Sequence, residues 1–121
     1  MKRTESHHEV TVALLRADPV MIPAYLEESL TNIDQSEGIP LFMTALRRAI
    51  DARGGIGRIA EQTGLNRETL YRTISANGNP TLKTLTAVMT AVGVPLSSFR
   101  LTEAPPPAPV IQIAESGKEP R

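Results

Sequence analysis

The sequence predicts an all-α protein, a small helical bundle. Several segments repeat their apolar residues three and four positions apart, which is the spacing of one face of an α-helix. The chain has two Phe, two Tyr and no Trp, so its interior must be built from aliphatic side chains, which suit short helices that pack closely. Gly and Pro stand at positions where these periodic segments begin and end.

Length and composition predict one soluble domain. A chain of 121 residues can bury a modest core, and the absence of Cys excludes disulfide frameworks, thiol catalysis and cysteine zinc sites. No apolar run has the length of a membrane-spanning helix, and the first ten residues contain no signal-peptide pattern. We therefore expect a cytoplasmic protein.

Residues 1–17 are expected to form an N-terminal arm. Residues 1–8 are polar and are predicted to be loose, and His7 and His8 lack the acidic cluster that would indicate a metal site. The next stretch gives a weak signal for an edge strand or an arm. Its alternating apolar residues are Val10, Val12 and Leu14.

A helical domain is predicted over residues 18–101. Asp18 and Pro19 are expected to cap and begin a helix that extends to Leu30, although Pro23 obscures its start. Residues 32–38 are predicted to be a loop. A helix then follows Pro40 and ends at Gly54 and Gly55; its apolar face is Phe42, Ala45, Leu46 and Ala49.

The last helix of the domain is expected to begin at Thr81 as its N-cap and to stop at Gly93. Its apolar face consists of Leu85, Val88, Met89 and Val92. Residues 102–121 are rich in Pro and polar residues and cannot bury enough apolar surface to offset the entropy of ordering them. We expect a disordered tail there.

Two short helices are predicted in the stretch "GIGRIAEQTGLNRETLYRTIS", residues 55–75. Gly64 can take the positive φ that a tight turn needs, and Leu65 can plug the core beneath that turn. Asn66 can cap the second helix, while Ala60 is small enough for the two helices to cross closely. Two helices joined by such a turn make the helix-turn-helix arrangement of DNA-binding proteins.

The charge distribution supports nucleic-acid binding although the net charge is zero, which alone would argue against it. Residues 47–83 are basic, with Arg47, Arg48, Arg53, Arg58, Arg67, Arg72 and Lys83 against Asp51, Glu61 and Glu68. Acidic residues gather instead at Glu27, Glu28, Asp34 and Glu37.

The second helix is expected to present a polar face outward. A helical wheel places Leu70, Thr73 and Ile74 on the inner side, and the outer side carries Glu68, Thr69, Tyr71, Arg72 and Ser75. Arg67 and Arg72 are the candidates for bidentate contacts with guanine.

Other outward residues leave alternatives open. Glu68 either orients Arg72 through an i, i+4 pair or accepts from a cytosine amino group, and the pair is equally consistent with a solvated surface ion pair. Tyr71 either leans on the domain edge or stacks on a sugar. Arg58, Asn66 and Asn77 are expected to contact phosphates.

From Gly55 to Pro95 the sequence resembles the Xre-like helix-turn-helix domains of phage-type repressors, with Ile59, Ala60, Gly64, Leu65 and Leu70 in the usual core positions. Over residues 18–96, "YLEESL" and the later run "GLNRETLYRTISANGNPTLKTL" resemble the addiction-module antidote proteins, the HigA-like antitoxins.

This resemblance implies a small helical bundle that dimerises, binds double-stranded operator DNA and neutralises a toxin, usually a RelE-like protein that cleaves mRNA. Pro23 and the long Pro-rich tail depart from the family pattern. Arg67 and Glu68 replace the glutamines that phage repressors often carry at the start of the recognition helix, so the DNA sequence read must differ.

Two other functions remain open at this point. One is a stand-alone regulator of phage-repressor type without a toxin, and the other is a protein-interaction module that uses the same helix on protein. The sequence shows no nucleophile with an adjacent base, no metal-ligand spacing and no phosphate loop, so we expect neither an enzyme nor a cofactor.

Overall fold

The computed structural model describes residues 3–75 and 77–99, with side chains described from His7 onward. Within this part the chain is all-helical, which confirms the predicted fold class. The helices are α1 (Arg3–Ala17), α2 (Met21–Ser29), α3 (Gly38–Ala52), α4 (Ile56–Thr63), α5 (Arg67–Thr73), α6 (Leu82–Ala91) and the short 3-10 helix η1 (Leu96–Ser98). The tail predicted over residues 102–121 lies outside the described residues.

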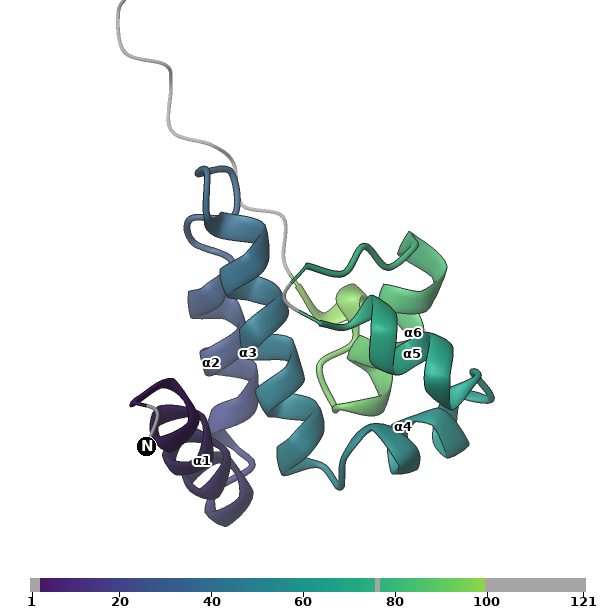
Figure 1. The fold of residues 1–121 in the computed structure, drawn as a ribbon, viewed down its shortest axis with the longest axis horizontal. Coiled ribbons are helices and arrows are strands. Elements are labelled where there is room, and N and C mark those ends of the chain that lie inside the picture. The colour runs from purple at the N-terminus through teal and green to yellow at the C-terminus, as the bar shows by residue number, and fades with distance from the viewer. Residues whose placement is uncertain (1–2, 76, 100–121) are drawn as a thin grey trace, which may run out of the picture.

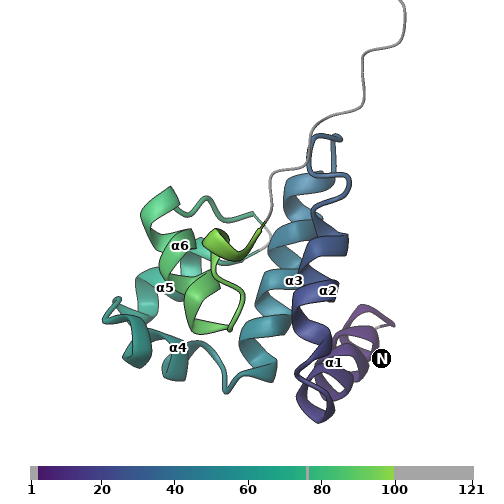
Figure 2. The ribbon, with the colours of Figure 1, turned by 180° about the vertical axis from the view of Figure 1, so that it is seen from behind.

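Helix α3 stands between two groups of helices. Figure 1 shows α1 and α2 on one side of it and α4, α5 and α6 on the other, and the reverse view in Figure 2 agrees. Helix α3 packs directly against α1, α2 and α4, and α4 in turn packs against α5 and α6. We call residues 3–37 the N-terminal half and residues 53–99 the C-terminal half.

One continuous, mainly aliphatic core joins the two halves. Every one of the six α-helices contributes to the cluster, from Leu15 in α1 to Val88 and Met89 in α6. Helix α3 supplies its centre, because its predicted apolar face (Phe42, Ala45, Leu46 and Ala49) is buried together with Met43 and Ile50. Burial of these side chains is the dominant favourable term that holds the halves together.

The predicted N-terminal strand is wrong, because residues 3–17 form helix α1. Two apolar residues three positions apart, Val12 and Leu15, point into the protein and are 7% and 4% exposed. Val10 and Leu14 are 55% and 65% exposed, so the alternation that indicated a strand does not correspond to a buried face. Helical packing against α3 therefore overrides the local strand signal.

The predicted start of α2 at Asp18 and Pro19 is also wrong. These two residues lie in the turn after α1, where the Met21 amide donates to the Asp18 carbonyl at 3.0 Å, and α2 begins at Met21. Pro23 is the third residue of α2. It is tolerated there because the first amides of a helix have no intrahelical partner, so the missing N–H costs no hydrogen bond.

Helix α3 begins at Gly38, two residues before the predicted start at Pro40. A Cβ atom at Gly38 would collide with the backbone carbonyls of Asn32 and Ile33. The residue at this position must therefore be glycine if the loop that precedes α3 is to lie against the start of the helix.

The signals at the ends of α6 are confirmed. The Thr81 hydroxyl accepts a hydrogen bond from the Thr84 amide at 3.0 Å, as an N-cap does. Gly93 has a φ of 91°, a conformation that L-residues rarely adopt, directly after the helix.

Candidate nucleic-acid interface

The turn between α4 and α5 consists of Gly64, Leu65 and Asn66 and is fixed by local hydrogen bonds. Gly64 adopts the left-handed conformation with a φ of 75°, as its position predicted. The Leu65 amide donates to the Thr63 hydroxyl at 3.3 Å, and the Leu65 side chain packs against the core. The angle at which α5 leaves α4 is therefore set by short-range interactions.

Asn66 caps α5, as predicted. Its Oδ1 atom accepts a hydrogen bond from the Thr69 amide at 2.8 Å. This bond satisfies one of the free amides in the first turn, and it also leaves that oxygen occupied. The side-chain NH2 of Asn66 is the donor that remains for contact with a phosphate.

Helix α5 is anchored on one side and open on the other. Leu70 and Ile74 are 1% and 0% exposed and belong to the common core. The opposite side carries five exposed residues of the predicted set, and Ser75 just after the helix is exposed as well; the five are Arg67, Glu68, Thr69, Tyr71 and Arg72. Because two buried anchors fix the rotation of this short helix, the polar face has a defined direction.

A hollow of ≈ 1060 Å³ lies between α5, the end of α3 and the start of α4. Five predicted residues line it, namely Arg67, Glu68, Tyr71, Arg72 and Ser75. Gly57 forms part of its floor, and a Cβ atom there would lie 3.5 Å from Cζ of Arg67. The Arg67 side chain thus extends over the first turn of α4.

Two residues of this hollow, Arg47 and Asp51 of α3, were absent from the sequence-based site. Cζ of Arg47 lies 4.9 Å from the centroid of the Tyr71 ring, which is a cation–π contact between α3 and α5. Nε of Arg47 donates to Oδ1 of Asp51 at 3.2 Å, one helical turn away. The i, i+4 spacing of Arg47 and Asp51 was visible in the sequence, but the contact with Tyr71 depends on how the fold places α3 relative to α5.

The remaining predicted residues lie outside the hollow. Arg58, Asn66, Thr69 and Asn77 are exposed, yet none of them lines it. In the part of the chain that the structure describes, Glu68 and Arg72 form no ion pair, so the predicted i, i+4 pairing is not seen. Tyr71 is 58% exposed, and the Arg47 guanidinium lies over its ring.

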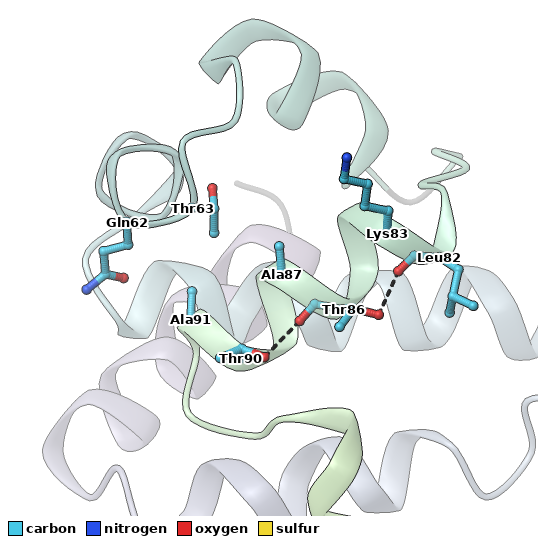
Figure 3. A pocket seen from close by; sticks show the side chains of 8 residues that line it. All are labelled: Gln62, Thr63, Leu82, Lys83, Thr86, Ala87, Thr90 and Ala91. Atoms are coloured by element: carbon cyan, nitrogen blue, oxygen red, sulfur yellow. Dashed lines mark hydrogen bonds between the residues drawn. The ribbon is translucent and has the colours of Figure 1, made fainter.

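A second hollow of ≈ 900 Å³ lies between the end of α4 and α6 (Figure 3). Its only charged residue is Lys83. The Thr86 hydroxyl donates to the Leu82 carbonyl at 2.8 Å, and the Thr90 hydroxyl donates to the Thr86 carbonyl at 3.0 Å. Because these hydroxyls bond within α6, the surface offers mainly methyl groups and provides no acid–base pair.

The N-terminal histidine segment differs from its prediction. His8 lies in α1, not in a loose segment, and bonds to Asp51 and Arg48 of α3. Between residues 7 and 99, leaving out residue 76, no group of three or more His, Cys, Asp or Glu residues is placed to hold a metal ion. No helix in these same ranges has the length and apolar character needed to cross a membrane.

Comparison with known proteins identifies the family of this chain. The model of a family described as "Probable addiction module antidote protein" matches residues 7–100, which include all of the hollow beside α5. An uncharacterized protein of Haemophilus influenzae is 35% identical over 91 residues, which cover 75% of this chain and 89% of that protein. No solved structure matches the chain. The match over both halves confirms the resemblance to antidotes, and the chain belongs to the family of probable addiction-module antidote proteins.

Proposed function

We propose that this antidote is the antitoxin of a bacterial type II toxin–antitoxin module, that it neutralises a RelE-like toxin, and that as a dimer it represses its own operon in the cytoplasm. It acts by binding and not by catalysis. The observation that carries the DNA-binding part is the polar face of α5, which two buried anchors and the Asn66 cap hold in one direction. Within this family we place the chain in the HigA-like subgroup, which its sequence resembles.

In this proposal α4 and α5 form an Xre-like helix-turn-helix and α5 enters the major groove. Arg67 and Arg72 read base edges, because an Arg fork on guanine is the commonest specific contact and contributes about 1–3 kcal/mol of discrimination. Glu68 accepts from a cytosine amino group, since it forms no pair with Arg72 among the described residues.

The neighbouring polar residues position the helix on the backbone. Thr69, Tyr71 and Ser75 flank the two arginines on the exposed face of α5. Arg58 and Asn77 contact phosphates from the edges, and Asn66 does so through its amide NH2. One such module buries little surface, so useful affinity requires a dimer on two half-sites about one helical turn of DNA apart.

The N-terminal half is the proposed surface for the toxin. Its exposed acidic residues are Glu9, Asp18, Glu27, Glu28, Asp34 and Glu37, and Arg16 is its one exposed Arg or Lys between residues 7 and 37. Val10, Leu14, Val20 and Met21 are large exposed apolar residues in the same half. An acidic surface with apolar side chains suits a basic protein partner.

The test is binding of the full chain to a labelled duplex from upstream of its own gene. The control is a shuffled duplex of equal length and composition, and both are measured at two salt concentrations. We expect the upstream duplex to bind more tightly and both affinities to fall as salt rises, because cationic side chains displace counterions from phosphates. Equal binding to both duplexes contradicts the proposed preference for the operator. Binding that is independent of salt contradicts the proposed contacts with phosphates.

A second assay separates the antitoxin from the alternative. The product of a neighbouring gene that encodes a small basic RelE-like protein is mixed with the chain and analysed by size-exclusion chromatography. A complex that blocks mRNA cleavage supports the antitoxin. A specific operator complex without any toxin partner favours a stand-alone phage-repressor-type regulator, for which the same α5 face is the supporting observation.

A further inference from the structure

A row of side chains connects α1 to α5 across α3. Nε2 of His8 lies 2.9 Å from Oδ2 of Asp51, and Oδ1 of Asp51 accepts from Nε of Arg47 at 3.2 Å. The Arg47 guanidinium then lies over the ring of Tyr71, 4.9 Å from its centroid. Residues that are 43 positions apart in sequence, His8 and Asp51, thereby meet next to the proposed DNA-binding face.

The neighbours of His8 determine which ring nitrogen carries the proton. Nε of Arg48 donates to Nδ1 of His8 at 3.2 Å, so Nδ1 must be an unprotonated acceptor. With Nδ1 as the acceptor, Nε2 carries the hydrogen and donates it to Oδ2 of Asp51. The imidazole is therefore held from both sides in one orientation.

Both oxygens of Asp51 are occupied, and the residue is held at its backbone as well. Nη2 of Arg16 donates to the Asp51 carbonyl at 2.9 Å, so two residues of α1, His8 and Arg16, bond to Asp51. A carboxylate that is engaged on both oxygens cannot rotate freely. Arg47, which bonds to it only through Nε, has its long side chain fixed while no hydrogen bond within the described residues uses its two terminal amino groups.

Arg47 lines the same hollow as Arg67 and Arg72. We propose that Arg47 is a further DNA-contacting residue, which binds a backbone phosphate beside Tyr71, and that His8 is a positioning residue that holds Arg47 in place through Asp51. This inference rests on the proposed operator binding. It assigns to α1 a part in DNA binding without contact between α1 and DNA.

An apolar substitution at His8 isolates the positioning step. His8→Leu removes the bond to Asp51 and introduces no charged group beside the DNA. His8→Gln keeps an N–H donor close to the position of Nε2 and serves as the rescue variant. His7→Leu is the matched control, because His7 is exposed and lies in the same helix.

The first readout needs no DNA. The full chain contains two tyrosines, so incorporation of fluorotyrosine gives two fluorine NMR resonances, and Tyr71→Phe identifies the one from Tyr71. We expect His8→Leu to shift the Tyr71 resonance and His8→Gln to restore it, while His7→Leu leaves it unchanged. A Tyr71 resonance that does not move in His8→Leu, in a protein that retains wild-type helicity, overturns the positioning by α1.

The second readout is affinity for the upstream and shuffled duplexes. We expect His8→Leu to weaken binding about threefold to tenfold, in the range of couplings transmitted through packed networks. Arg47→Met should weaken both duplexes about tenfold and lower the salt slope by about one, as loss of a phosphate contact does. Unchanged affinity in Arg47→Met overturns the Arg47 contact.

The two readouts distinguish failure of the proposed operator binding from failure of the positioning role of His8. If the wild-type chain binds neither duplex specifically, the proposed function fails and the Arg47 contact fails with it. If the wild-type chain binds specifically but His8→Leu and His7→Leu behave alike, only the positioning role of His8 is overturned.

Discussion

The two halves of the molecule begin their helices in different ways. In the C-terminal half, α5 and α6 start at Asn66 and Thr81, whose side chains accept from the amides of the first turn. In the N-terminal half and its junction, α2 and α3 start at Val20 and Glu37 without a side-chain cap. Local sequence therefore fixes where α5 and α6 begin, whereas α4, which follows Gly55 without a side-chain cap, begins like α2 and α3.

The halves also differ in charge. The exposed charges of the N-terminal half are mostly acidic, and those around α5 are mostly basic. This division explains how a chain with zero net charge can carry a surface suited to phosphate and another suited to a basic protein. The division teaches that the sum of charges says less about partners than their placement does.

The largest expected effect is loss of the shared core. Leu46→Ala should lower the free energy of unfolding by about 2–5 kcal/mol, because Leu46 is fully buried in α3, between the halves. Urea denaturation followed by circular dichroism measures this, and Leu41→Ala, in the same helix but 60% exposed, is the control. Two separate transitions, with one half unaffected, would show that the halves fold independently.

The next effect concerns the basic side. Arg72→Ala should abolish preference for the operator, a loss of about 1–3 kcal/mol, and leave the fold intact because Arg72 is exposed. Arg72→Lys keeps the charge without the guanidinium fork, so it should bind both duplexes equally. Unchanged operator affinity in Arg72→Ala, with wild-type helicity, removes the recognition role of α5.

A smaller effect is expected at the cap. Asn66→Ala should cost about 1 kcal/mol of stability because the Thr69 amide loses its acceptor, whereas Asn66→Asp should cost little. Thermal and urea unfolding of the two variants, beside Asn77→Ala as an exposed control, measure the difference. Equal stability of Asn66→Ala and Asn77→Ala would mean that local capping does not set α5.

The smallest change in stability is expected on the acidic side. The double substitution Glu27→Gln and Glu28→Gln should alter the free energy of unfolding by less than about 0.5 kcal/mol, since both side chains are exposed. It should nevertheless weaken the toxin complex, measured by isothermal titration, while operator binding persists. Glu61→Gln, an exposed acid in the C-terminal half, is the control. Equal loss of toxin binding in both would contradict the division of surfaces.

The same contrast explains how much could be predicted from the sequence. The α4–α5 turn was predicted because Gly64 and Asn66 act on their immediate neighbours. Helix α1 was missed because Val10 and Leu14 are exposed although their spacing imitates one face of a strand. Only contact with α3 selects Val12 and Leu15 as the buried pair, and that contact is not local.

The residues of the candidate site also divide into those that the local sequence predicts and those that depend on tertiary contacts. Five exposed residues of α5, and Ser75 just after it, follow from the helical period once Leu70 and Ile74 are assigned to the core. Arg47 could not be predicted, because its place beside Tyr71 depends on how the tertiary fold places α3 relative to α5. His8 was missed for a related reason: its partners Asp51 and Arg48 lie 43 and 40 residues away in sequence, on α3.

The order in which the helices pack has a consequence for the speed of folding. The main helix contacts join helices that are close in sequence. Helices α1 and α2 pack against α3, α3 packs against α4, and α4 packs against α5 and α6. Such short loops close at little entropic cost, and bundles of this kind fold on the order of microseconds to milliseconds. A freshly synthesised copy would therefore reach its binding-competent state much sooner than the ribosome could finish another chain.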